Sequence, residues 1–165
     1  CITRGLPGSM MPNIYGNAYQ ILQTPGYVAI RYEMVHDTRI IPLDGRPHLG
    51  EGIREYFGDA RGRWEGHTLV VESTNFTDRS HMGYNNQYNS RAFRLTERFT
   101  PIAADRLYWE VTVDDPETWT RPWTFAMPLT KNDRHAVFEY ACHEGNYGLV
   151  NLLSGARAEE GRRGR

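Results

Sequence analysis

The chain has 165 residues, of which 39% are hydrophobic, 24% charged and 12% aromatic, and its formal net charge is -1. This length suits one domain with a buried core, and the aromatic content argues against a disordered chain. The balance of 19 basic and 20 acidic residues gives no global attraction to nucleic acid or anionic lipid. No apolar run approaches the roughly 20 residues that span a bilayer.

Strand-like segments make up most of the chain after an irregular start. Residues 1–16 are rich in Gly, Pro and Ser and show no hydrophobic period, which predicts an extended lead-in. The strand-like segments that follow are separated by turns rich in Pro, Gly, Asp and Asn. They cover residues 17–24, 27–34, 36–43, 68–74, 91–100, 107–114, 123–130 and 135–142. Residues 63–67 predict a tight hairpin, with Glu65-Gly66 between two strand-like pieces, that leads into residues 68–74. The close spacing of these segments, without helices between them, predicts antiparallel connections.

Two further segments depart from the strand pattern. Residues 53–57 lie in a glycine-rich stretch and predict a short helical turn. Near the C-terminus, Leu149, Leu152 and Leu153 recur at helical spacing. We therefore expect a short C-terminal helix that packs on the sheet and is followed by a frayed tail.

These elements predict an all-β fold, an antiparallel meander of about eight strands. Because the edges of a wide sheet must be closed or covered, a lipocalin-like barrel or a strongly curved sheet is the simplest arrangement. A two-sheet β-sandwich is the alternative. The expected divisions are an extended lead-in at 1–16, a β-barrel-like domain at 17–147, and a helix with its tail at 148–165.

Glu97 is the most informative departure from the alternation of polar and apolar residues. In the segment 91–100 its side chain shares a face with phenylalanine and leucine side chains. A carboxylate on an apolar face must be paired, protonated or functional. Two interpretations stay open: an interior salt bridge, with Arg31 or Arg39 as the partner, or a general acid or base.

The segment 27–48 combines strand-forming residues with many charges. Arg31 and Glu33 share one face of a predicted strand, and His36 lies across its end. Together with Arg39 they could form the polar wall of a ligand cavity, in which the arginines bind an anionic or carbonyl oxygen and the histidine moves a proton. The alternative is the solvent-exposed face of an edge strand.

Three other side chains belong to the candidate ligand site. His48 closes an Asp-Gly-Arg-Pro-His turn, but its spacing from His36 matches no metal motif, so no metal or other cofactor is predicted. Trp64 and Trp109 could provide stacking surfaces for sugar rings or aromatic ligands, and positions in the core are the alternative.

The two cysteines, Cys1 and Cys142, leave two possibilities open. They form a disulfide, which would indicate an exported protein, or they are unrelated thiols.

Five motifs along the chain resemble a widespread group of uncharacterised, exported bacterial proteins from soil lineages. They are QTPG at 23–26, DGRPH at 44–48, GRWEG at 62–66, LTERF at 95–99 and YACHEGNYG at 140–148. The resemblance carries no known activity. It implies a periplasmic or extracellular location and a further portion of chain before Cys1, and it favours the disulfide.

The combined prediction is an exported β-barrel-like protein that binds a small molecule or carbohydrate in a polar, aromatic-lined cavity. If the protein is a lyase or hydrolase, Glu33, His36 and Glu97 are the catalytic candidates, and Arg31 and Arg39 stabilise negative charge. The competing hypothesis is a structural or assembly subunit. In that case the charges form interior salt bridges and the aromatic residues make contacts within a homo-oligomer.

Overall fold

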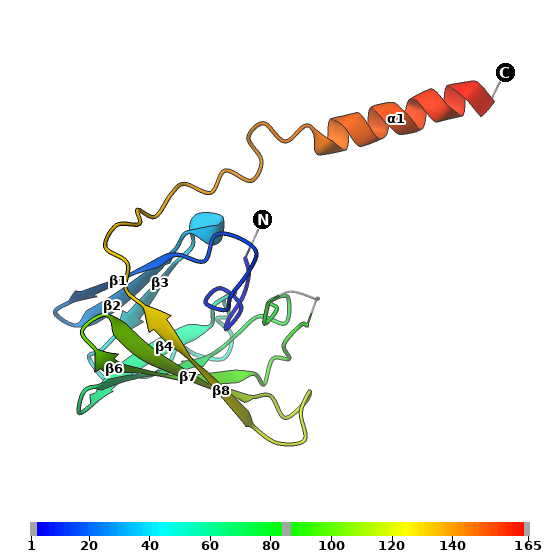
Figure 1. The fold of residues 1–165 in the computed structure, drawn as a ribbon. Coiled ribbons are helices and arrows are strands. Elements are labelled where there is room, and N and C mark those ends of the chain that lie inside the picture. Colours follow the sequence, from blue (N-terminus) through cyan, green and yellow to red (C-terminus); the bar gives the residue numbers. More distant parts are fainter. Residues whose placement is uncertain (1–2, 84–86, 164–165) are drawn as a thin grey trace.

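The computed structural model describes residues 3–83 and 87–163 and consists mostly of β-strands, with one α-helix at its C-terminal end (Figure 1). The first antiparallel sheet contains β1 (Tyr19–Thr24), β2 (Tyr27–Tyr32) and β3 (Thr38–Pro42). The second contains β4 (Asp59–Glu65), β5 (Thr68–Thr74), β6 (Arg94–Ala103), β7 (Arg106–Asp114) and β8 (Trp123–Thr130). A short 3-10 helix, η1 (Met34–His36), follows β2, and α1 spans Gly148–Arg163. The predicted antiparallel β class and the C-terminal helix are confirmed.

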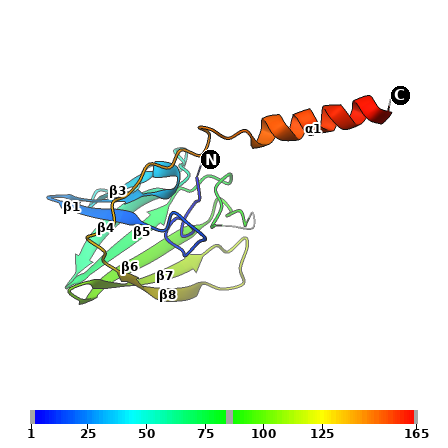
Figure 2. The same cartoon turned by 45° about the horizontal axis from the view of Figure 1, so that its top comes forward.

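The strands do not close into the predicted lipocalin-like barrel. Within residues 3–83 and 87–163, no ladder joins β3 to β4 or β1 to β8, so each sheet keeps two edges. β3 ends at Pro42, which has no N–H to continue a ladder, and residues 43–58 then run to β4 without forming a strand. In Figure 2 the three-stranded sheet lies above the five-stranded sheet.

Side-chain alternation gives the five-stranded sheet one apolar face. Burial alternates residue by residue along β6 and β7, as expected for strands with one face in a core. One row across this face joins Gly62, Val71, Glu97, Val111 and Phe125, which are partners in successive ladders. Glu97 is the one charged residue of the row.

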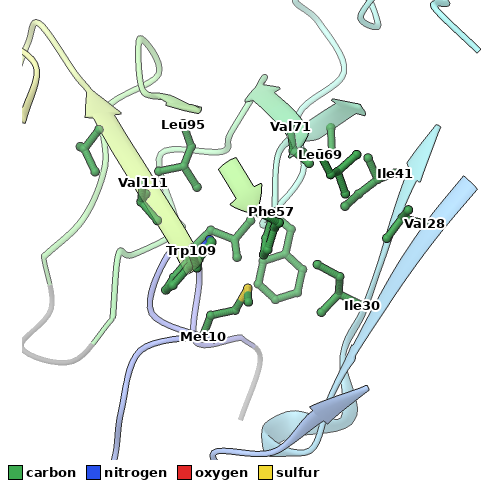
Figure 3. Packing of buried hydrophobic residues seen from close by; sticks show 14 of the residues in the cluster. Met10, Val28, Ile30, Ile41, Phe57, Leu69, Val71, Leu95, Trp109 and Val111 are labelled. Carbon is green, nitrogen blue, oxygen red and sulfur yellow. The ribbon is translucent and has the colours of Figure 1, made fainter. Parts of the chain in front are cut away.

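The hydrophobic core lies between the two sheets (Figure 3). The first sheet contributes Val28, Ile30, Tyr32 and Ile41, and the second contributes Ala60, Leu69, Val71, Leu95, Phe99, Trp109, Val111 and Val113. Each fully buried aliphatic or aromatic side chain of this kind contributes roughly 1.5–3 kcal/mol. The core therefore joins the sheets where no backbone ladder does.

Gly62 allows the two sheets to approach closely at β3 and β4. A Cβ at this position would lie 2.6 Å from Leu43 Cδ2 and 2.8 Å from Ile41 Cγ2. The predicted hairpin at Glu65-Gly66 lies between β4 and β5. The start of β4 was not predicted, because its glycine and the neighbouring glycines favour a connecting loop in the sequence.

Residues 4–10 are buried, although residues 1–16 were predicted to be extended. Backbone hydrogen bonds between near neighbours fold this segment into turns. Leu6 and Met10 enter the core. A Cβ on Gly8 would come within 2.4 Å of Gly83 Cα, so the backbone of the segment lies directly against the loop after β5.

Three local predictions are wrong. Residues 135–142 form no strand, and residues 53–57 form no helical turn. Helix α1 does not pack on the sheets: none of its residues is buried, and in Figure 1 it extends away from them. Leu149, Leu152 and Leu153 are therefore exposed.

Candidate functional site

Glu97 forms a buried ion pair with Arg39 between the two sheets. Arg39 Nη2 lies 2.5 Å from Glu97 Oε2, and the two side chains are 2% and 0% exposed. Trp109 Nε1 donates to Glu97 Oε1 at 3.2 Å, and Arg39 Nη2 donates to Ser73 Oγ at 2.8 Å. The partner of Glu97 is thus Arg39, one of the two arginines that the sequence suggested.

The polar atoms around this ion pair are only partly satisfied. Tyr32 and Arg39 interact within this buried cluster, and Arg39 Nε and Nη1 make no hydrogen bond of standard geometry among the described residues. Burial raises the pKa of the Tyr32 hydroxyl, and the Glu97 carboxylate adds to this increase, so Tyr32 remains protonated. Burial by itself would lower the pKa of Arg39, but Glu97 and Tyr32 raise it above its usual value. Arg39 therefore stays charged.

A polar pocket of about 540 Å³ opens beside Arg39, between β3 and residues 54–60. Its polar lining residues carry both hydrogen-bond donors and acceptors, and an aromatic ring lies among them. They are Asp37, Thr38, Arg39, Arg54, Glu55 and Tyr56. This set, which we call the β3 pocket, can bind a ligand that both donates and accepts hydrogen bonds.

Arg54 and Asp37 both line the β3 pocket. Arg54 Nη1 donates to Phe76 O at 3.1 Å and to Arg91 O at 2.8 Å, which fixes the guanidinium. Its Nε is buried and has no partner among the described residues. Burial raises the pKa of the Asp37 carboxyl above its usual value.

Glu33 and His36 do not converge with Glu97. They contact residues 131–142, which follow β8 and which we call the strap. Glu33 Oε2 lies 3.1 Å from His135 Nε2, and it accepts a hydrogen bond from Phe138 N at 3.3 Å. His36 Nδ1 lies 3.3 Å from the Tyr140 carbonyl oxygen. The three catalytic candidates therefore occupy two separate places.

His48 belongs to a third place, at the start of β4. Its Nδ1 lies 3.0 Å from Asp59 Oδ2, and the same oxygen accepts a hydrogen bond from Leu49 N at 2.8 Å. Arg61 Nη1 lies 2.5 Å from Asp59 Oδ1. These contacts tie the Asp-Gly-Arg-Pro-His turn to β4 and leave His48 outside the β3 pocket.

The remaining ligand-binding candidates are also separated. Trp109 is fully buried and stacks on Phe99, with ring centroids 6.3 Å apart, so it is a core residue. Trp64 lies in β4 and is 46% exposed. Arg31 is exposed and lines a different crevice, which shares no residue with the β3 pocket. Of the five ligand-binding candidates, only Arg39 lines the β3 pocket.

The sequence prediction missed Arg54, Glu55 and Tyr56. A usable signal was present, because two charged residues and an aromatic residue lie between Gly52 and Gly58. Such residues on a glycine-flanked connection are typical of binding loops. The interpretation of 53–57 as a helical turn hid them.

The comparisons add no relative: no family model, no curated protein and no solved structure matches the chain. No helix within residues 3–83 and 87–163 is long and apolar enough to cross a membrane. Over the same residues, no group of three or more His, Cys, Asp or Glu side chains is arranged to hold a metal ion. Cys142 is disulfide-bonded, whereas Cys1 lies outside the described residues.

Proposed function

We propose that the protein is an exported carbohydrate-binding protein whose ligand occupies the β3 pocket of a two-sheet scaffold. The main support for the proposal is the mixture of hydrogen-bond donors and acceptors that line the β3 pocket. Arg39 and Arg54 bring guanidinium groups to its lining, and Asp37 and Glu55 bring carboxylate oxygens. Sugar hydroxyls donate and accept hydrogen bonds, so they match both kinds of group.

The size and the aromatic content of the pocket support the same ligand class. A volume of about 540 Å³ falls in the usual range for small-molecule sites. Tyr56 is 36% exposed at the pocket and offers an apolar surface on which a sugar ring can stack. The disulfide at Cys142 supports an oxidising, exported location.

We expect the protein to bind its sugar without converting it chemically. The Glu97 carboxylate already contacts Arg39 and Trp109 inside the core. Glu33 and His36 contact the strap. None of these candidates is available as a free acid or base beside the pocket.

Calorimetric titration with a panel of hexoses, amino sugars, uronic acids and disaccharides tests the proposal. We expect at least one sugar to bind with a Kd below about 1 mM. Asp37→Asn and Arg54→Gln should each weaken that binding about tenfold or more, because each removes a charge-assisted hydrogen bond. Glu51→Gln is the matched control, since Glu51 is exposed near the pocket but does not line it.

Thermal unfolding of each variant separates a lost contact from a lost fold. If no sugar in the panel binds, or if Asp37→Asn binds it as the unchanged protein does, the β3 pocket is not a carbohydrate site.

One observation favours the second candidate function, an assembly subunit. The apolar side chains of Leu149, Leu152 and Leu153 are 68%, 68% and 44% exposed on α1. We propose to compare the mass in solution of the full chain with that of a chain ending at residue 147. A homo-oligomer that becomes monomeric on removal of α1 would support assembly, and a monomer in both cases would exclude self-assembly through the helix.

A further inference from the structure

A second crevice lies where the ends of the two sheets meet the strap. Its volume is about 830 Å³, and it shares no lining residue with the β3 pocket. It is bounded by the start of β1, the hairpin between β6 and β7, the end of β8 and residues 131–137 of the strap. β1 and β8 are edge strands of different sheets, and in the described part of the chain no ladder joins them. We call this space between the two edges the strap crevice.

The first wall of the strap crevice belongs to the inner face of the three-stranded sheet. Tyr19 and Ile21 pair with Tyr32 and Ile30 across the ladder between β1 and β2, and both partners are core residues. Because residues that pair across a ladder share a face, Tyr19 and Ile21 also point inward. Ile30 is 1% exposed, whereas Ile21 is 38% exposed. The core therefore leaves an inward-facing aliphatic side chain partly uncovered at the crevice.

The second wall belongs to the inner face of the five-stranded sheet. Leu107 lies two residues before the fully buried Trp109 in β7 and shares its face. Leu129 is the ladder partner of Leu107 and lies on the same face. Both leucines are only partly buried, and the strap adds Ala136 and Val137 to the lining. Apolar side chains thus face the crevice from two sheets, with the strap along a third side.

The charged strand residues of the lining do not face these walls. Arg31 alternates with core residues along β2, so its side chain projects from the outer face of the first sheet. Arg106 alternates with Leu107 in the same way and projects from the outer face of the second sheet. In the strap, Lys131 Nζ forms an ion pair with Asp133 Oδ2 at 2.9 Å. A charged ligand would therefore lose hydration without meeting an opposite charge on either wall.

We infer that the strap crevice binds an uncharged small molecule with an apolar body. The body lies against Ile21, Leu107 and Leu129, between the two sheet edges. Covering these side chains removes apolar surface from water, which drives the binding. The volume is in the usual range for small-molecule sites, and the strap along the third side leaves less room for a partner's strand or helix. The inference does not rest on the sugar proposal, since the two sites have no residue in common.

Methyl NMR of the full chain, titrated with 1-octanol and with octanoate, tests the inference. 1-Octanol should shift the methyl signals of Ile21, Leu107 and Leu129 with a Kd below about 1 mM. Octanoate has an apolar body of the same length but carries a charge, so it should bind about tenfold more weakly or not at all.

Two neighbouring positions in β1 give a matched pair of variants. Leu22 is 46% exposed, follows Ile21 directly and points to the opposite face of the sheet. Ile21→Ser should weaken the binding of 1-octanol about fivefold or more, whereas Leu22→Ser should leave it unchanged. Thermal unfolding checks that both variants are folded, and the methyl shifts of the unchanged protein locate the ligand even if Ile21→Ser is not.

Three results would overturn the inference. The first is that 1-octanol does not bind, or that it shifts the exposed leucines of α1 and not those of the crevice. The second is that octanoate binds as tightly as 1-octanol. The third is that folded Ile21→Ser and Leu22→Ser bind 1-octanol equally well. Failure of the sugar panel would leave all three measurements unaffected.

Discussion

Among the described residues, Glu97 forms its ion pair with Arg39 alone and accepts a further hydrogen bond from Trp109. A buried ion pair contributes little net stability, but removing one member leaves the other charge buried and uncompensated. Arg39 is also buried, and within residues 3–83 and 87–163 its Nε and Nη1 make no hydrogen bond of standard geometry. The pair therefore fixes how the sheets face each other more than it strengthens the fold.

Glu97→Gln should reduce the free energy of unfolding by about 3–5 kcal/mol, because Arg39 then lacks its counter-charge. Urea denaturation measures this change. The double variant Glu97→Leu/Arg39→Met should recover most of the loss, since neither charge then remains in the core. A single variant as stable as the unchanged protein would mean that the ion pair has no structural role.

Asp115 gives a prediction for the dependence of stability on pH. Its carboxylate accepts hydrogen bonds from Ser90 N, Ser90 Oγ and Thr118 Oγ1 at 2.9, 2.5 and 2.9 Å. Burial acts to raise the pKa of Asp115, but the hydrogen bonds from Ser90 and Thr118 outweigh it and hold that pKa below its ordinary 3.8. The folded state thus keeps the carboxylate ionised at a lower pH than the unfolded chain does.

Asp115→Ala should lower the free energy of unfolding by about 1–3 kcal/mol at pH 7. The difference from the unchanged protein should persist above the unfolded pKa and shrink as the pH falls below about 3.8. Urea titrations at several pH values check this. Asp114→Ala, at the neighbouring and more exposed position, should show no such pH dependence.

The missing side chain of Gly62 allows β3 and β4 to approach closely. Gly62→Val should destabilise the fold by about 1–3 kcal/mol, because its side chain would overlap Ile41 and Leu43. Chemical denaturation gives the value, and adding Leu43→Ala should restore part of it. Gly52→Ala is the control, since a Cβ at Gly52 has nothing within 4 Å. Equal effects of both substitutions would contradict close packing at Gly62.

The strap depends on a few side-chain contacts instead of a ladder. Glu33→Gln removes the charge that faces His135, so the strap should open more often. Trypsin should then cut after Lys131 and Arg134 about fivefold faster, which corresponds to the loss of roughly 1 kcal/mol. Glu51→Gln should leave the cleavage rate unchanged. Identical rates for Glu33→Gln and the unchanged protein would show that Glu33 does not hold the strap.

The predictable elements are those in which local pattern and tertiary contacts agree. In β6 and β7 the side chains alternate in the sequence and in the burial of the folded chain. The segment 135–142 has strand-forming residues, but Glu33 and His36 hold it through side-chain contacts, without a strand as partner. The start of β4 was missed for the opposite reason, because Gly62 weakens the local signal although tertiary packing requires it.

The candidate site was less predictable from the sequence than the fold. The pairing of Glu97 with an arginine followed from its position on an apolar face, and Arg39 was one of two named partners. The β3 pocket depends on where residues 54–60 cross the end of β3, and no local pattern encodes that crossing. Residues 4–10 likewise lie in the core only because both sheets leave room for them.

β1 leaves one edge of the three-stranded sheet unpaired, and this affects how the protein behaves at high concentration. Its sequence, YQILQT, has no charge and no proline, which is the composition of segments that stack into intermolecular β-sheets. Leu22 is 46% exposed on this strand. Leu22→Lys should lengthen the lag phase of thioflavin T fluorescence in concentrated, agitated samples, whereas Ile102→Lys, in β6, should not. We therefore expect the storage lifetime of the purified protein to depend on the β1 edge, whatever ligand the protein binds.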